Sequence, residues 1–432
     1  MKLSLGVLLA AIMASSSVTT TTTNALSQSI VVVGLNAALQ KRFILPPGKN
    51  LEPGNVHRAH ITETGVGGKG QDVGVALSCL MLSNQSGQQQ QSSTTTCDDK
   101  VLLAQFLGMG PEGDAVSDML QSKYGLSDAL TIRNNAPLRT CTTIVGADQA
   151  TELVETSGEV TALEMKALQD KVEEMTNQGG RANGVCIMGS MPPGCDEDTY
   201  ADLTSRLADS NTLVLIDSVI GLEPLLSSLK TTFGNNKEKQ GGVVLKLNAA
   251  EICNLAGVAK GAGETDQVTL DELTASTIGF VTKYANAIGA LDYLCITDGK
   301  FPGYLVEIPS SVSSSVRTWQ LPSVDLSNAG MLYPIGAGDT VAAGTLAAWQ
   351  YLHHNSGVVP SRIGKLLLER RAQWSSGEGG ASSDEAKGYN VATAFAFGLA
   401  CGSASCLKQE NSVFDVDDAI KFFGGMAKPV IR

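Results

Sequence analysis

One stretch decides how this chain folds: Pro334-Ile335-Gly336-Ala337-Gly338-Asp339-Thr340. Its small residues allow a tight turn and leave N–H groups unobstructed, and an apolar helix pattern follows over residues 341–351. The first N–H groups of a helix lack internal partners, so they favour an anion such as a phosphoryl group. Asp339 would then accept the proton of an attacking hydroxyl. The stretch also fits a plain turn whose Asp caps the helix.

The composition of the chain limits the classes of function to consider. The chain has 432 residues, of which 43% are hydrophobic, so it can bury a large core as one large α/β domain or two smaller ones. A net charge of −12 argues against nucleic acid as a partner. The nine cysteines form no C-x-x-C pattern, and the four histidines show no catalytic or metal-ligand setting. Any phosphate ligand must therefore be held locally.

The N-terminus has the pattern of a targeting segment. Lys2 precedes an apolar run over residues 3–13, and small residues follow, as in a secretory signal peptide. Residues 14–29 are rich in Ser and Thr and contain no acid, as in transit peptides. We expect residues 1–29 to be a leader, either a plain secretory signal or a bipartite plastid leader. No later segment is long and apolar enough to span a membrane.

Strand and helix patterns alternate through most of the chain. Short β-branched or apolar runs predict strands, and longer amphipathic runs between them predict helices. Such alternation implies a parallel sheet with helices on both faces, and ligands then lie beyond the carboxyl ends of the strands. Strands are expected at 29–33, 101–107, 140–146, 185–189, 213–217, 243–247 and 293–297, helices at 67–82, 163–175, 196–207, 270–288 and 341–351, and polar insertions at 83–98, 232–241 and 354–388.

Four glycine-rich or polar turns fall at the same predicted sheet edge. They are Gly189-Ser190, Lys246-Leu247-Asn248, Thr297-Asp298-Gly299 and Gly336-Ala337-Gly338-Asp339. The chain also carries four longer motifs: Gly67-Gly68-Lys69-Gly70, Gly189-Ser190-Met191-Pro192-Pro193-Gly194, Lys246-Leu247-Asn248-Ala249-Ala250-Glu251 and Gly336-Ala337-Gly338-Asp339. In their order and spacing these motifs resemble those of the PfkB (ribokinase-like) family of carbohydrate kinases. The resemblance covers nearly the whole chain from about residue 30. It implies an α/β fold, namely a three-layer αβα sandwich with a mostly parallel central sheet and a small β lid.

Within that family, the chain is most similar to the tagatose-6-phosphate and fructose-1-phosphate kinases. Leu138-Arg139-Thr140-Cys141 stands where those enzymes carry a strand whose Arg contacts the substrate phosphate. Thr151-Glu152-Leu153-Val154-Glu155 resembles their Thr-Glu-x-x-Glu strand. The resemblance implies an ATP-dependent phosphotransferase acting on a sugar hydroxyl, most often of a sugar phosphate, with ATP and Mg²⁺ as cofactors.

Two positions depart from the family pattern. The early sugar-binding Asp is here Gln40, and the Asn after Gly-Gly-Lys-Gly is here Asp72. A carboxylate only accepts hydrogen bonds, whereas an amide also donates them, so the recognised hydroxyl pattern changes. We interpret the pair as one carboxylate and one amide with their positions exchanged. Two alternatives stay open: a kinase of a neutral sugar, and a non-catalytic sugar or nucleotide sensor.

The resemblance assigns a role to each candidate residue. Asp339 is the general base, and the residues before it form the anion hole. Lys69 is expected to position other groups rather than to act in catalysis. The remaining assignments are the anion hole (Gly336, Ala337, Gly338), the substrate site (Gln40, Gly67, Gly68, Asp72, Arg139, Ser190), the ATP site (Lys246, Thr297, Gly299) and the metal site (Asn248, Glu251).

The expected organisation is a leader followed by one kinase domain over residues 30–432. Its lid strands are expected within about 43–61, 101–106 and 140–155. Such a lid excludes water from the site and limits wasteful ATP hydrolysis. Members of the family often pair through the lid, so a homodimer is a further expectation. Small sugars and ATP are the expected partners, without nucleic acid and without a membrane once the leader is removed.

Overall fold

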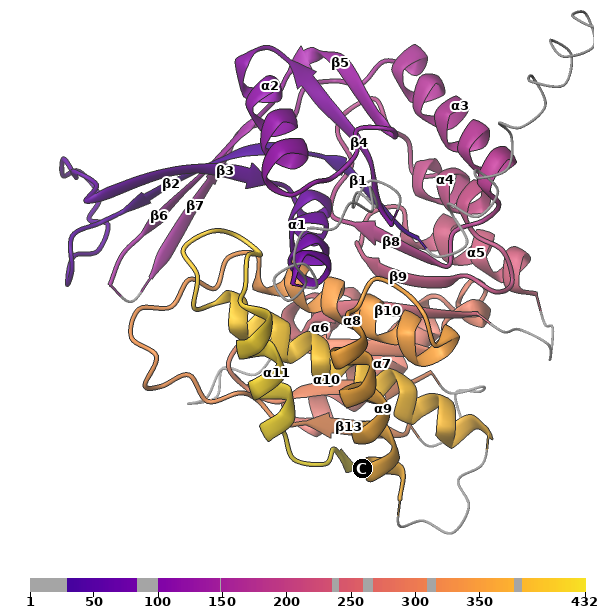
Figure 1. The fold of residues 1–432 in the computed structure, drawn as a ribbon. Helices are drawn as coiled ribbons and strands as arrows, with labels where there is room; N and C mark the ends of the chain where they lie inside the picture. The colour runs from indigo at the N-terminus through magenta and orange to yellow at the C-terminus, as the bar shows by residue number, and fades with distance from the viewer. Residues whose placement is uncertain are drawn as a thin grey trace, which may run out of the picture.

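The computed structural model describes residues 29–83, 100–147, 149–234, 241–258, 267–308, 316–376 and 383–432, with side chains from residue 386 in the last range. Figure 1 shows a large α/β body from which a small sheet projects to one side. The predicted leader lies outside the described residues apart from Ser29. Among the described residues, no helix is both long and apolar enough to cross a membrane.

A single large sheet runs through the body in the order β14-β13-β12-β11-β10-β9-β8-β1-β4-β5. Its strands are parallel from β11 to β5, so their carboxyl ends meet at one edge, while β12, β13 and β14 are antiparallel. The strands are β1 (Ile30–Asn36), β4 (Val101–Met109), β5 (Thr131–Pro137), β8 (Gly184–Met188), β9 (Leu213–Asp217), β10 (Gly242–Asn248), β11 (Tyr293–Thr297), β12 (Gly303–Glu307), β13 (Thr318–Leu321) and β14 (Val430–Ile431).

Both faces of this sheet are covered, which makes three layers. Alternate residues of β1 belong to different cores: Ile30 and Val32 to one, Val31 and Val33 to the other. This pattern follows because successive side chains of a strand point to opposite faces. The first face carries α1 (Lys69–Leu82), α2 (Pro111–Asp118), α8 (Ala337–His354), α9 (Ser361–Ser375), α10 (Ser383–Ser405) and α11 (Val416–Gly425); the second carries α3 (Ala162–Gly179), α4 (Thr199–Leu207), α5 (Leu222–Phe233), α6 (Ala249–Ala256) and α7 (Leu270–Lys283).

We call the projecting four-stranded sheet the lid, after the element expected from the sequence. Its strand order is β3-β2-β6-β7, with β2 parallel to β6 (Figure 1). The strands are β2 (Ala38–Ile44), β3 (Ile61–Gly67), β6 (Thr140–Val145) and β7 (Ala150–Val154).

The lid differs from the sequence expectation in two places. Residues 101–106 belong to β4, which is buried in the main sheet beside β1 rather than in the lid. Residues 43–61 are mostly a loop, because β2 ends at Ile44 and β3 begins at Ile61. The expectation for residues 140–155 agrees with β6 and β7. An apolar run suits a central strand buried on both faces, which explains the placement of β4.

Two other expectations change in the structure. The helix expected over residues 341–351 begins four residues earlier, at Ala337, so Asp339 lies in its first turn. The long insertion at 354–388 contains the whole of α9, whose buried Ile363 and Leu367 pack into the core. The insertion at 83–98 lies almost wholly outside the described residues.

A close backbone contact fixes α1 against β1 and so sets the position of the site. A Cβ added at Gly70 would lie 2.3 Å from the Cα of Gly34, and a Cβ at Gly34 would lie 2.5 Å from the Cα of Gly70. Both neighbouring atoms are backbone atoms, which cannot move aside without shifting a helix or a strand. The two glycines therefore allow the amino end of α1 to reach the carboxyl end of β1.

We expect Gly70→Ala to lower the free energy of unfolding by about 1–3 kcal/mol, the usual cost of overpacking. Gly424→Ala is the matched control, since a Cβ there meets nothing within 4 Å and alanine favours a helix. Chemical denaturation of the two variants and the wild type measures the difference. Equal stability of the Gly70 variant and the wild type would contradict the role given to this contact.

Candidate active site

The turn before α8 has the geometry expected of an anion site. Gly336 caps the helix with φ of 81°, a left-handed conformation, and a Cβ on it would lie 2.6 Å from the Oγ of Ser412. The N–H of Thr340 donates to Gly336 O at 2.9 Å, which begins the helical ladder. The N–H of Ala337 donates to Pro334 O at 3.1 Å. The amides of Gly338 and Asp339 are therefore the ones that lack an acceptor one turn earlier in the helix.

A buried carboxylate joins two lysines beside this turn. Asp217, at the carboxyl end of β9, accepts from Lys69 Nζ at 2.9 Å and from Lys246 Nζ at 2.5 Å. Lys69 belongs to the first turn of α1, and Lys246 lies on β10. A Cβ on Gly338 would lie 3.4 Å from Lys246 Nζ, so this ammonium is next to the glycine turn. Asp217 thus holds two positive charges at the sheet edge.

The charges around Asp339 shift its proton affinity. Burial raises the pKa of Asp339, and the nearby Asp217 adds to this, while Lys69 and Lys246 oppose it; the pKa becomes about 7. The carboxyl is only 8% exposed. A general base works best with a pKa near the working pH, so the environment suits Asp339 to proton transfer at neutral pH.

The pKa of Asp217 moves the other way. Burial by itself would raise it, but the ammonium groups of Lys246 and Lys69 outweigh burial and hold the pKa of Asp217 below its ordinary value. Two carboxyls in one site therefore have opposite proton affinities, because only Asp217 is directly ion-paired. Such separation makes Asp339 the better proton acceptor of the two and leaves Asp217 as a fixed negative charge.

A cavity of about 330 Å³ opens beside these groups at the carboxyl ends of the strands. Arg139 and Ser190 line it, as does Asn36, whose Nδ2 donates to Ser190 Oγ at 2.9 Å. Arg139 donates from Nη2 to Asn36 O at 2.9 Å and from Nε to Ala37 O at 3.3 Å. These bonds fix the guanidinium at the cavity wall. The fixed guanidinium of Arg139 and the ammonium of Lys69 make this wall of the cavity suited to an anion.

The predicted sugar-binding residues lie where the lid meets α1 and α8. Gln40 on β2 is buried and donates from Nε2 to Thr143 Oγ1 at 2.6 Å. A Cβ on Gly67 would lie 3.2 Å from that of Gln40, which explains the glycine there. Asp72 on α1 is buried, and its Oδ1 has no hydrogen-bond partner. Burial and the negative charge of Asp339 both raise the pKa of Asp72.

Gly68 acts through the backbone. Its φ is 105°, which favours glycine, and its carbonyl accepts from the N–H of Asp72 at 2.9 Å. The structure thus brings Gln40, Gly67, Gly68 and Asp72 into one region near Asp339.

The predicted ATP and metal residues lie farther along the sheet edge. Asn248 and Glu251 form a capping box on α6: the N–H of Glu251 donates to Asn248 Oδ1, and the N–H of Asn248 to Glu251 Oε2, each at 2.8 Å. Thr297 is the register partner of Asn248, and Gly299 follows with φ of 60°. Of these four, only Glu251 lines the 330 Å³ cavity. Within the described ranges, no three His, Cys, Asp or Glu side chains gather as a metal centre.

Sequence reasoning missed Asp217. The signal was available, because Asp217 ends a buried strand in the parallel sheet, where functional side chains gather. It also missed Arg42, a buried arginine on β2 two residues beyond Gln40. The sequence around Arg42 does not indicate that this side chain is buried, since a charged residue in a short strand is equally compatible with exposure to solvent.

Comparisons with known proteins identify the fold. No protein-family model matches the chain. Phosphofructokinase-2 from Escherichia coli, solved with potassium, is 16% identical, and the match covers 92% of this chain and 98% of that one at a TM-score of 0.59. A possible 1-phosphofructokinase from Thermotoga maritima is 17% identical over 93% and 99%, at 0.57. Ribokinase from the same organism is 13% identical over 92% and 100%, at 0.55.

These likenesses show a ribokinase-like αβα fold with a mostly parallel sheet, and the expected fold class is confirmed. They extend over almost the whole length of each neighbour. The resemblance to the PfkB family that the four motifs indicate is therefore matched by the three-dimensional structure.

We expect Asp217→Asn to lower the free energy of unfolding at pH 7 by about 3–5 kcal/mol, because it leaves the buried Lys246 ammonium unpaired. Since its folded pKa is lowered, Asp217 stabilises the fold above its unfolded pKa, and that contribution is lost as pH falls through the folded value. The difference from the wild type should therefore shrink in acid.

The control is Asp170→Asn, which removes an exposed pair with Lys166 and should cost no more than about 0.5 kcal/mol. Urea unfolding at pH 7 and at acidic pH measures both variants. A similar cost for the two substitutions would refute the bridging role of Asp217.

Proposed function

We propose that this protein is an ATP-dependent carbohydrate kinase that phosphorylates a hydroxyl of a sugar phosphate. One observation carries the proposal: the buried Asp339, with its pKa near 7, lies in the first turn of α8 beside unpaired amides and the Lys246 ammonium. The fold neighbours support it, because they include phosphofructokinase-2 in complex with fructose-6-phosphate and with substrates and products.

The proton transfer follows from the position of Asp339. The attacking sugar hydroxyl donates its proton to the Asp339 carboxylate, which makes the oxygen a better nucleophile toward the γ-phosphorus of ATP. Burial keeps water away from the carboxylate and supports its raised proton affinity. Lys69 and Lys246, anchored by Asp217, lie close enough to stabilise the negative charge that Asp339 carries before the transfer.

The moving phosphoryl group would meet donors that are already in place. The amides of Gly338 and Asp339 point from the helix N-terminus, and Lys246 adds a full positive charge beside them. When bound with ATP, Mg²⁺ would neutralise phosphate charge. Glu251 and Asn248 fit an indirect contact through water, because their capping box already occupies an oxygen of each side chain.

The phosphate already on the acceptor would lie at Arg139 and Ser190. Arg139 is fixed by two backbone carbonyls, and Arg suits phosphate through several parallel donors. Gln40 and Asp72 would then bind sugar hydroxyls between this phosphate and Asp339. Because an amide and a carboxylate have exchanged positions here, the arrangement of hydroxyls that the site accepts is set by Gln40 and Asp72. Fructose-1-phosphate and tagatose-6-phosphate are the first two acceptors to test.

The assembly proposed for this kinase is a homodimer through the lid. Exposed apolar side chains on β7, Leu153 and Val154, support a lid that packs against a second copy. Sedimentation of the purified protein tests this assembly independently of activity.

We expect Asp339→Asn to lower kcat by about 10²–10⁴-fold, because the amide keeps the shape but cannot accept the proton. ATP affinity and the melting temperature should change little. The assay uses ATP-Mg²⁺ with a panel of sugars and sugar phosphates, and calorimetry measures ATP binding. Activity within about threefold of the wild type would sink the base assignment. A wild type that binds sugars but transfers no phosphoryl group would favour the sensor alternative.

The pH profile gives a second test of Asp339. Only the deprotonated carboxylate accepts a proton, so kcat/KM should fall about tenfold per unit as pH drops below about 7. The pH dependence is measured from pH 5 to 9 with the best acceptor. A profile that stays flat down to pH 5 would be incompatible with the raised pKa of the base.

We expect Arg139→Ala to raise KM for a phosphorylated acceptor at least tenfold and to change KM for a neutral sugar far less. The reason is that only the phosphorylated acceptor presents an anion to the guanidinium. Steady-state kinetics with matched pairs, such as fructose and fructose 1-phosphate, measure the ratio. If neutral sugars are the better substrates of the wild type, a ribokinase-like activity replaces the sugar-phosphate one.

A further inference from the structure

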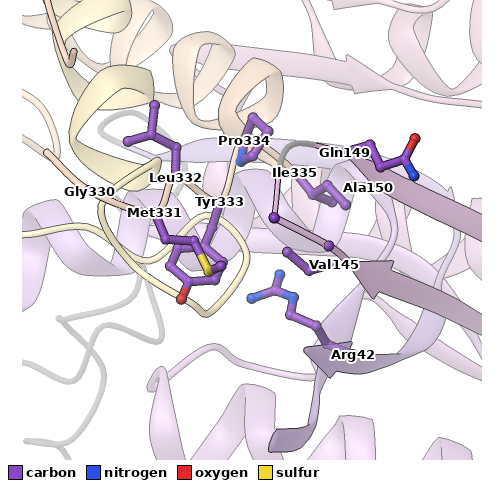
Figure 2. Close-up of a pocket in the computed structure, with 12 residues that line it drawn as sticks. Arg42, Val145, Gln149, Ala150, Gly330, Met331, Leu332, Tyr333, Pro334 and Ile335 are labelled. Carbon is purple, nitrogen blue, oxygen red and sulfur yellow. The ribbon is translucent and has the colours of Figure 1, made fainter. Parts of the chain in front are cut away.

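Arg42 on β2 is a buried charge at the boundary between the lid and the C-terminal part of the chain. Its side chain is only 4% exposed. Figure 2 shows the guanidinium extending from the lid toward the segment that contains Tyr333, which leads into the Gly336 turn. Neighbouring residues on β2 differ: Lys41 and Phe43 alternate with Arg42 and are partly exposed on the opposite face of the strand.

The guanidinium crosses from the lid to a distant loop. Its Nη2 donates to the side-chain oxygen of Asn411, which lies 369 residues later in the chain. Its Nη1 lies 3.7 Å from Glu63 Oε2, an ion pair too long for a hydrogen bond. Both Nε and Nη1 are buried without a hydrogen-bond acceptor. Among the described residues, the side-chain oxygen of Asn411 is therefore the hydrogen-bond acceptor of the Arg42 guanidinium.

The loop that receives this bond supports the anion site directly. Ser412, next to Asn411, is fully buried and has φ of 57°, a left-handed conformation unusual for serine. Its Oγ donates to Gly336 O at 3.0 Å. The same carbonyl accepts from Thr340 N and so begins α8. A continuous set of contacts thus runs from Arg42 through Asn411 and Ser412 to the residue that caps the catalytic helix.

The surroundings show why this contact matters for the lid. Arg42 borders two cavities of about 300 Å³ each, one against residues 330–335 and one against the region of Lys123 and Tyr124. The lid is therefore loosely packed on both sides of Arg42. A polar contact between two loosely packed surfaces has more influence on their relative position than the same contact inside a dense core.

We propose that Arg42 is a positioning residue that couples the lid to the anion site through Asn411 and Ser412. When the lid covers the acceptor, Arg42 holds the 411–412 loop, and that loop fixes Gly336 and the amides that follow it. Loss of the contact leaves the lid and the glycine turn free to move independently. The expected loss of kcat rests on the proposed kinase activity. The expected loosening of the glycine turn does not depend on any activity.

Stability does not account for a charge in this position. Burying a guanidinium with unpaired N–H groups costs free energy, and replacing a buried charge together with its partner by apolar side chains of similar size is often neutral or stabilising. Arg42→Met alone also leaves the Asn411 oxygen without its donor and removes a positive charge near Asp72, so we expect a lower melting temperature. A role in positioning predicts a defect in kcat that persists at temperatures where the variant is fully folded.

The experiment compares Arg42→Met, Asn411→Ala and the double variant. We expect each single change to lower kcat at least tenfold, with KM of the acceptor within about threefold, and the double variant to be no worse than the worse single one. Arg42→Lys should recover part of the loss. Lys41→Gln is the matched control, a charge removed from the opposite face of the same strand, and it should leave kcat unchanged.

Hydrogen exchange of the full-length protein, without substrates, tests the coupling independently of catalysis. Arg42→Met should speed exchange of the Thr340 amide, and Lys41→Gln should not. Unchanged exchange at Thr340, or strictly additive losses in the double variant, would overturn the proposal. An equal loss with Lys41→Gln would overturn it as well. If the wild type transfers no phosphoryl group, the proposed function fails, and the exchange result still decides whether Arg42 positions the turn.

Discussion

The carboxylate of Asp217 is the interaction on which the site depends. It ends β9 and binds one lysine from the first turn of α1 and another from β10, so it ties a helix and two strands together at the sheet edge. Without it, the buried Lys246 ammonium would lie close to the partly exposed Lys69 ammonium with no counter-charge between them, which is unfavourable. With it, both positive charges stay fixed near the place where phosphoryl charge would move. Preorganised charge of this kind needs no rearrangement during a reaction.

The same arrangement explains how one site holds several carboxyls with different behaviour. Asp217 is directly paired, so its pKa is held low, while Asp339 and Asp72 lack such partners and their pKa values are raised. The raised values follow from burial and from the mutual repulsion of neighbouring acids. Carboxyl groups with high and with low proton affinity are therefore made from one residue type by differences in burial and pairing.

The lid brings a second constraint. It is a separate small sheet whose base joins the apolar core through Leu39 and Val66, whereas cavities border Arg42. The contact of Arg42 with Asn411 adds a polar link between the lid and the loop that holds Gly336.

The sequence by itself determined the features that depend on local chemistry. The alternation of apolar strands and amphipathic helices predicted the parallel αβα sheet, and the small residues of 336–338 predicted the turn before Asp339. Glycine turns at strand ends predicted which edge carries the site. Such patterns are readable because side-chain periodicity and backbone freedom are properties of neighbouring residues.

Only the tertiary structure decided what depends on residues far apart in the chain. It placed residues 101–106 in the main sheet instead of the lid, because the choice of β1 as the neighbouring strand is not encoded in the strand alone. It brought Asp217 between Lys69 and Lys246, and Arg42 against Asn411. A charged residue in a strand looks the same in sequence whether it meets solvent or a buried partner. Packing of distant elements makes that choice.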